Sequence, residues 1–101
     1  MRRHGIDFPE EILAAFCKKH RIRRCALFGS VLRDDFGPES DIDVLVEFEP
    51  GARVGLAFFD IQDELSTLLG RSVDLHTPAF LGKHFRQEVV ASAETLYDAA
   101  A

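Results

Sequence analysis

Residues 41–48 constrain the fold most, because apolar and acidic side chains alternate along them. Successive side chains on a β-strand point to opposite faces, so the alternation predicts a strand with two different faces. The apolar face consists of Ile42, Val44, Val46 and Phe48, and the opposite face of Asp41, Asp43, Leu45 and Glu47. The chain is therefore expected to contain a strand that carries carboxylates on one side and core residues on the other.

Three helices are predicted from hydrophobic spacing and from turn residues. Residues 8–20 carry apolar side chains at helical intervals, which predicts an amphipathic opening helix. Between residues 54 and 69 the apolar positions follow spacings of four, three, four and three, which predicts a second amphipathic helix, ended by Gly70. A further helix is expected to start at residue 77 and to run through at least residue 91.

Two further strands and one loop are predicted from short apolar runs and turn formers. Residues 23–28 and 72–76 have the length and punctuation of short strands. The first ends at Gly29, where we expect the chain to change direction. Residues 31–40 are rich in Asp, Gly, Pro and Ser and predict a loop, with space for one helical turn at its start. Residues 94–97 fit either a helix or a small edge strand.

Length, composition and charge favour one globular domain over residues 1–101. Hydrophobic residues make up 47% of the chain, and no repeat, linker or low-complexity segment interrupts it. A domain this small has little material for a separate substrate-binding domain, so a transferase of this size needs its acceptor from elsewhere. The net charge of −5 argues against a dedicated binder of duplex DNA, since such binders neutralise phosphates.

The cysteines and the hydropathy favour a cytoplasmic protein. Cys17 and Cys25 are too few for a disulfide scaffold and lack the CxxC spacing of metal or redox sites, so we expect reduced, largely buried thiols. No segment approaches the roughly 18 consecutive apolar residues of a membrane span. We therefore expect no membrane association.

Three aspartates form the candidate catalytic group. Asp41 and Asp43 project from one face of the predicted strand, with Cα atoms about 6.5 to 7 Å apart. Carboxylates this close repel one another unless a cation lies between them, and Mg²⁺ prefers such oxygen ligands. Asp74 would complete a two-metal site if its strand pairs beside residues 41–48, and it could then accept the proton of an acceptor hydroxyl. On spacing alone, Asp41 and Asp43 fit a solvated strand face equally well.

Gly29 and Ser30 offer a complementary site for phosphate. A glycine lets phosphate approach the backbone closely, and the following turn presents N–H donors and the Ser30 hydroxyl. Arg33, one turn later, is placed to reach the same phosphates. Simpler interpretations remain open, because Gly29 and Ser30 also fit a strand-ending turn and Arg33 fits a surface residue paired with Asp34 or Asp35.

Other polar residues and motifs point to no competing site. Glu47 shares the face of Asp41 and Asp43 but lies farther along the strand, where at most it assists. The P-loop pattern GxxxxGK[ST], the dinucleotide pattern GxGxxG and the GxSxG elbow are absent from the sequence. We expect all four histidines to be structural or exposed, because they show no metal-ligand spacing: His4, His20, His76 and His84.

The run from Phe28 to Phe48 resembles the minimal nucleotidyltransferases of the DNA polymerase beta superfamily. That family's signature is Gly-Ser, ten residues and then Asp-x-Asp, which matches Gly29-Ser30, residues 31–40 and Asp41-Ile42-Asp43. The similarity extends over most of the chain, because Val73-Asp74-Leu75 matches the strand that carries the third family carboxylate. Arg33 also matches, although Asp34 stands where the family commonly has glycine.

The resemblance implies an α/β fold with a small mixed β-sheet flanked by helices. It implies that Asp41, Asp43 and Asp74 are the metal-binding and catalytic residues and that Gly29 and Ser30, with Arg33, bind the nucleotide. The implied cofactor is Mg²⁺, and the implied substrate is an NTP, most often ATP.

Small free-standing members of this family look like antitoxins encoded beside a helical HEPN partner, an RNase toxin. Some of them silence the toxin by attaching AMP to a tyrosine, which implies a protein adenylyltransferase here. The alternative is a catalytically weak antitoxin that neutralises its partner by forming a complex, and both homo- and hetero-oligomers fit either reading. Transfer onto a small molecule such as an aminoglycoside is disfavoured, because such enzymes generally carry an additional domain.

Overall fold

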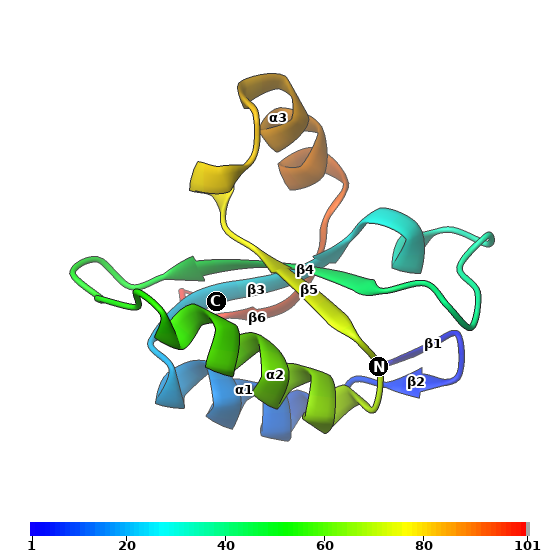
Figure 1. Cartoon of the computed structure of the whole chain (residues 1–101), viewed down its shortest axis with the longest axis horizontal. Helices are drawn as coiled ribbons and strands as arrows, with labels where there is room; N and C mark the ends of the chain where they lie inside the picture. Colours follow the sequence, from blue (N-terminus) through cyan, green and yellow to red (C-terminus); the bar gives the residue numbers. More distant parts are fainter. Residues whose placement is uncertain (101) are drawn as a thin grey trace.

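The computed structural model describes residues 1–100 and has a four-stranded mixed sheet at its centre (Figure 1). The strands lie in the order β5-β4-β3-β6, with β3 at Ile22–Phe28, β4 at Ile42–Phe48, β5 at Val73–His76 and β6 at Glu94–Asp98. The β4 and β5 strands run parallel, and the other neighbours run antiparallel. The α/β fold with a small mixed sheet, which the resemblance implied, is confirmed.

Two helices cover one face of this sheet, and a third helix lies on the opposite side (Figure 1). The covering pair consists of α1, Glu10–Lys19, and α2, Ala57–Leu69, which ends at the left-handed Gly70 as predicted. Both helices bury apolar side chains in the core cluster that also contains the predicted apolar face of β4: Leu13, Phe16 and Cys17 from α1, Ile61, Leu65 and Leu69 from α2, and Ile42, Val44 and Val46 from β4. The main core therefore lies between these two helices and the sheet.

The opposite face of the sheet has a thinner cover. There Leu45 and Phe28 pack against Leu81 and Val89, which belong to the segment around α3, Lys83–Ser92. Val89 is the one residue that α3 itself buries. Because Asp43 and Leu45 share a strand face, the carboxylate of Asp43 lies on this thinly covered side.

The predicted helix over residues 77–91 is wrong in its first part. A 3-10 turn spans Pro78–Phe80, after which Leu81 and Gly82 are extended, and α3 begins only at Lys83. The break is explained by burial, since the extended backbone lets Leu81 pack into the core beneath α3. Residues 94–97, left open between helix and strand, form part of the edge strand β6, which pairs with β3.

The loop between β3 and β4 starts with the single helical turn that the sequence allowed, a 3-10 turn at Gly29–Leu32. Arg71 fastens the rest of this loop, since its guanidinium donates hydrogen bonds to the carbonyl oxygens of Gly37 and Ser40, both at 2.9 Å. The same guanidinium lies over the Phe36 ring, 4.7 Å from its centroid. These contacts fix the chain where it enters β4.

A short N-terminal hairpin was not predicted. It joins β1, Arg2–Arg3, to β2, Ile6–Asp7, through His4 and Gly5, which both have positive φ. Strands of two residues are too short to show any periodicity.

The expected free and buried state of Cys17 and Cys25 is confirmed. Within residues 1–100, no helix has the length and apolar character needed to cross a membrane.

Candidate active site

Asp43 and Asp74 lie side by side on two neighbouring strands. They are direct register partners in the parallel β4–β5 pair, so the condition set for the third carboxylate, that its strand pairs beside residues 41–48, is met. On the other side of Asp43, Phe28 at the end of β3 is its register partner. The Asp43 side chain is 28% exposed and that of Asp74 is 55% exposed, which leaves both carboxylates accessible.

His76 lies between these two carboxylates. Its Nε2 atom is 3.3 Å from an oxygen of Asp43 and 3.3 Å from an oxygen of Asp74. The imidazole also packs against the Phe28 ring in a T-shaped arrangement, with ring centroids 5.0 Å apart. His76, expected from the sequence to be structural or exposed, thus contacts both carboxylates of the candidate site. Strand alternation carried the missing signal, since His76 follows Asp74 by two residues and shares its face.

Burial and neighbouring charges alter the protonation of Asp43. Burial raises the pKa of Asp43, and the charges of Asp74 and Asp41 raise that pKa further, while the hydrogen bond and charge of His76 lower it. The pKa of Asp43 is therefore above its ordinary value, which means that the surrounding protein does not fully stabilise the negative charge of the ionised carboxylate. A bound cation would supply the missing positive charge.

Gly29 is fitted closely to Asp43. Its φ of +75° is a conformation that L side chains rarely adopt, and a Cβ built on it would lie 2.5 Å from Oδ2 of Asp43. Two residues later, the buried Val31 anchors the 3-10 turn Gly29–Leu32 to the core. Glycine at this position thus lets the turn bend and leaves space for the carboxylate.

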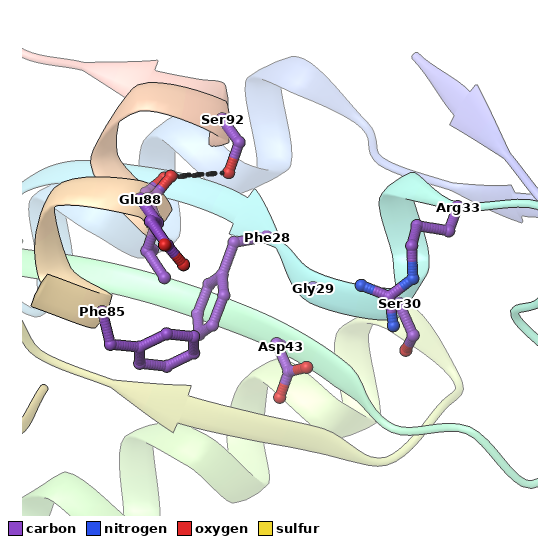
Figure 2. A pocket seen from close by; sticks show the side chains of 9 residues that line it. Phe28, Gly29, Ser30, Arg33, Asp43, Phe85, Glu88 and Ser92 are labelled. Carbon is purple, nitrogen blue, oxygen red and sulfur yellow. Dashed lines mark hydrogen bonds between the residues drawn. The ribbon is translucent and has the colours of Figure 1, made fainter.

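A pocket of about 520 Å³ opens between the 3-10 turn and α3 (Figure 2). Figure 2 shows Ser30 and Arg33 on one side of it, Phe85 and Glu88 on the other, and Asp43 below Gly29. The residues that line the pocket are Phe28, Gly29, Ser30, Arg33, Asp43, Phe85, Glu88, Val89 and Ser92. The predicted phosphate site and one predicted metal ligand therefore share a single pocket.

Three of the polar residues considered in the sequence lie outside the group formed by Asp43, Asp74 and His76. Asp41 is exposed and directly precedes β4, near enough to raise the pKa of Asp43 but outside the group of Asp43, Asp74 and His76. Arg33 lines the pocket, yet its Nε donates a hydrogen bond of 3.2 Å to Asp35, as the simpler interpretation held. Glu47 instead accepts hydrogen bonds from two arginines of β3, Arg23 and Arg24.

The cluster around Asp43 fits a divalent cation. One ligand atom each of Asp43, Asp74 and His76 lie within 4.8 Å of one another. Carboxylate oxygens are the ligands that Mg²⁺ and Mn²⁺ accept, and imidazole nitrogen suits transition metals. The donor set and the space left by Gly29 thus fit a divalent cation, whose identity the geometry does not select.

Comparison with protein families gives one match over most of the chain, because residues 9–96 match the model of the nucleotidyltransferase domain. The chain belongs to the nucleotidyltransferase domain family. The resemblance derived from the Gly-Ser and Asp-x-Asp spacing is thereby confirmed.

Relatives of this nucleotidyltransferase include several archaeal proteins. A Methanocaldococcus jannaschii protein, named as an inferred protein adenylyltransferase, is 45% identical over 58 residues, which cover 57% of this chain and 58% of that protein. The protein adenylyltransferase MntA of Thermococcus cleftensis is 39% identical over 70 residues, which cover 65% of this chain and 70% of that protein. The match to the first relative thus spans less than two thirds of its length.

Solved structures of similar fold include minimal nucleotidyltransferases. A protein described as a candidate minimal nucleotidyltransferase superimposes with a TM-score of 0.71 at 33% identity, covering 83% of this chain and 85% of that chain. A toxin–antitoxin complex determined with AMP-PNP superimposes with a TM-score of 0.71 at 22% identity, covering 88% of this chain and 73% of that chain. At that identity the second match shows a shared fold alone.

Proposed function

We propose that this nucleotidyltransferase uses a divalent metal, Mg²⁺ in the simplest case, to transfer AMP from ATP to a hydroxyl group of a protein partner. One observation carries the proposal: the Asp43 and Asp74 carboxylates are register partners beside the turn of Gly29 and Ser30. Metal ligands next to a phosphate-binding turn are what displacement at a nucleotide's α-phosphorus requires. The adenylyltransferase names of relatives support the choice of AMP.

Each protein group has a task in the proposed reaction. Backbone N–H groups of the turn and the Ser30 hydroxyl hold phosphate oxygens, and Arg33 adds positive charge at the same end of the pocket. Asp43 and Asp74, with Asp41 as the predicted additional carboxylate, would hold the cation, which when bound neutralises the charge of the triphosphate. Asp74, more exposed than Asp43, accepts the proton of the acceptor hydroxyl. The hydroxyl oxygen bonds to the α-phosphorus as the bond to the bridging oxygen breaks, and pyrophosphate leaves.

The proposed acceptor is a tyrosine of a HEPN-type toxin, which would make this protein an antitoxin. The proposal draws on the family resemblance and on the solved toxin–antitoxin complexes of MntA and HepT that share this fold.

The direct test is to isolate the protein with its copurifying partner and to add α-labelled ATP with Mg²⁺. Label is expected on the partner, and mass spectrometry is expected to place AMP on a tyrosine. A partner that copurifies yet stays unlabelled with each of the four NTPs would contradict transfer. Neutralisation by complex formation alone, which needs no nucleotide, would then be the better description.

Phe85 is expected to stack on the nucleobase. This α3 residue is 52% exposed, packs in a T-shaped arrangement beside Phe28, with ring centroids 6.4 Å apart, and lies across the pocket from Ser30 (Figure 2). Phe85→Ala should raise the KM for ATP about tenfold with a smaller change in kcat, because base–aromatic stacking contributes roughly 1–3 kcal/mol. Steady-state kinetics on the labelled partner measures both constants.

Phe59→Ala provides the matched control for this variant. Phe59 is 58% exposed, similar to Phe85, but it lines a different, apolar pocket beside α2. The control should leave the KM for ATP unchanged. Equal KM values for ATP in wild type and Phe85→Ala would contradict the stacking of Phe85 on the nucleobase.

A further inference from the structure

We propose that His76 is a direct metal ligand and gives this site a preference for first-row transition-metal ions over Mg²⁺. The proposal deepens the proposed function and shares with it the location of the cation. It goes beyond the three family carboxylates, because His76 is a residue of this chain that the signature motif does not include.

The distances around His76 suit ligation. Its Nε2 lies 3.3 Å from Oδ1 of Asp43 and 3.3 Å from Oδ2 of Asp74. Adjacent donors of an octahedral ion with bonds of about 2.1 Å lie about 3.0 Å apart. Small side-chain rotations are therefore sufficient to bring all three donors onto one ion.

The imidazole is held in this position by its surroundings. His76 pairs in register with Leu45 of β4, and the preceding Leu75 donates its backbone N–H to Oε1 of Gln62 on α2 at 2.9 Å. The Phe28 ring meets the imidazole edge to face. A ligand oriented in advance loses less conformational entropy when the ion binds.

The chemistry of the donors sets the preference. Mg²⁺ is a hard ion that favours oxygen ligands and keeps several waters, so an imidazole adds little to its affinity. Imidazole nitrogen binds Co²⁺ and neighbouring transition metals more strongly, and affinity at mixed sites rises from Mn²⁺ towards Co²⁺. The difference in affinity between Co²⁺ and Mg²⁺ is therefore larger at a site of two carboxylates and one imidazole than at a site of carboxylates alone.

A different role for His76 makes the opposite prediction. As a protonated counter-charge it would neutralise Asp43 and Asp74 and compete with any cation. Removing it would then raise the affinity for Mg²⁺ and Co²⁺ alike, because both ions would meet less repulsion. The sign of the change in affinity thus separates a ligand from a counter-charge.

The experiment titrates the nucleotide-free full chain with Co²⁺, followed by visible absorption, and with Mn²⁺, followed by electron paramagnetic resonance. Mg²⁺ affinity comes from competition against Mn²⁺. His76→Gln should weaken Co²⁺ binding about tenfold or more, as expected for the loss of an imidazole ligand. Mg²⁺ affinity should change less than about threefold. Pulsed measurements on the Mn²⁺ complex should show coupling to a directly bound nitrogen in the wild type and none in the variant.

His84→Gln is the control, because His84 is an exposed histidine of α3 outside the cluster. His76→Val serves as a second variant, with a side chain suited to a strand, and thermal unfolding checks that each variant folds. Unchanged Co²⁺ affinity, tighter binding of all ions, or no nitrogen coupling in the wild type would overturn the proposal. Nucleotide transfer plays no part in these readouts, so a protein that binds Co²⁺ through His76 but transfers no AMP would refute the proposed function alone.

Discussion

Asp43→Asn is expected to lower the rate of AMP transfer by at least roughly 10²- to 10³-fold, the range for loss of one electrostatic group that stabilises a transition state. Asp43 is the carboxylate common to the pocket and to the cluster with Asp74 and His76. An amide retains the shape of the side chain but removes its charge. Transfer of label to the partner, measured over a time course, gives the rate.

The same substitution is expected to preserve or raise the thermal unfolding temperature at neutral pH. The folded-state pKa of Asp43 is raised, so above that pKa its ionisation opposes folding; this cost shrinks as the pH falls below the folded-state pKa and is gone below the lower pKa of the unfolded chain. Asn carries no such cost. Loss of activity without loss of stability would therefore mark Asp43 as a functional residue.

Asp60→Asn is the matched control for Asp43→Asn, because Asp60 is an exposed carboxylate in the first turn of α2. It should leave the transfer rate at the wild-type value. Transfer by Asp43→Asn at the wild-type rate would contradict the assignment of Asp43 to the reaction.

Gly29→Ala is expected to lower the free energy of unfolding by roughly 1–3 kcal/mol, since a non-glycine residue at positive φ is strained. Its added methyl group would also lie 2.5 Å from Oδ2 of Asp43, so either the turn or the carboxylate must shift. We therefore expect AMP transfer to fall sharply as well. Chemical denaturation measures the first effect and the labelling assay the second.

Gly51→Ala separates strain from contact. Gly51 also has positive φ, +84°, but nothing lies within 4 Å of a Cβ built there. This variant should show the loss of stability that comes from strain while keeping full transfer activity. If Gly29→Ala also lost stability but kept full transfer activity, the close fit between Gly29 and Asp43 would not be needed for the reaction.

Much of the site was predictable because strand alternation is a local property. The pattern in residues 41–48 placed Asp43 on the face opposite the core, and the parallel pairing of β4 with β5 brought Asp74 beside it. His76 shares a strand face with Asp74, which the same alternation indicates, but its contact with Asp43 is not local, because these two residues are 33 apart in sequence. Metal-ligand spacing searched along one segment does not detect donors on separate strands.

The predicted start of the third helix was wrong because tertiary packing overrides the local helical preference there. Residues 77–82 have helical signals, but burial of Leu81 requires an extended backbone before α3. The sequence could not decide the role of the loop residue Arg33 either, because it fitted both a phosphate contact and an ion pair with Asp34 or Asp35. In the structure Arg33 lines the pocket and also donates a hydrogen bond to Asp35. Choices of this kind depend on neighbours that are distant in the chain.

The thin attachment of α3 gives the two walls of the pocket unequal local stability. Asp43 and Asp74 belong to paired strands of the central sheet, whereas α3 buries Val89 as its one core residue. Segments with few buried apolar contacts open at lower free-energy cost than core strands, so amide hydrogens of α3 should exchange with solvent faster than those of β4. Local opening of α3 would widen access for a macromolecular hydroxyl while the carboxylates stay in register.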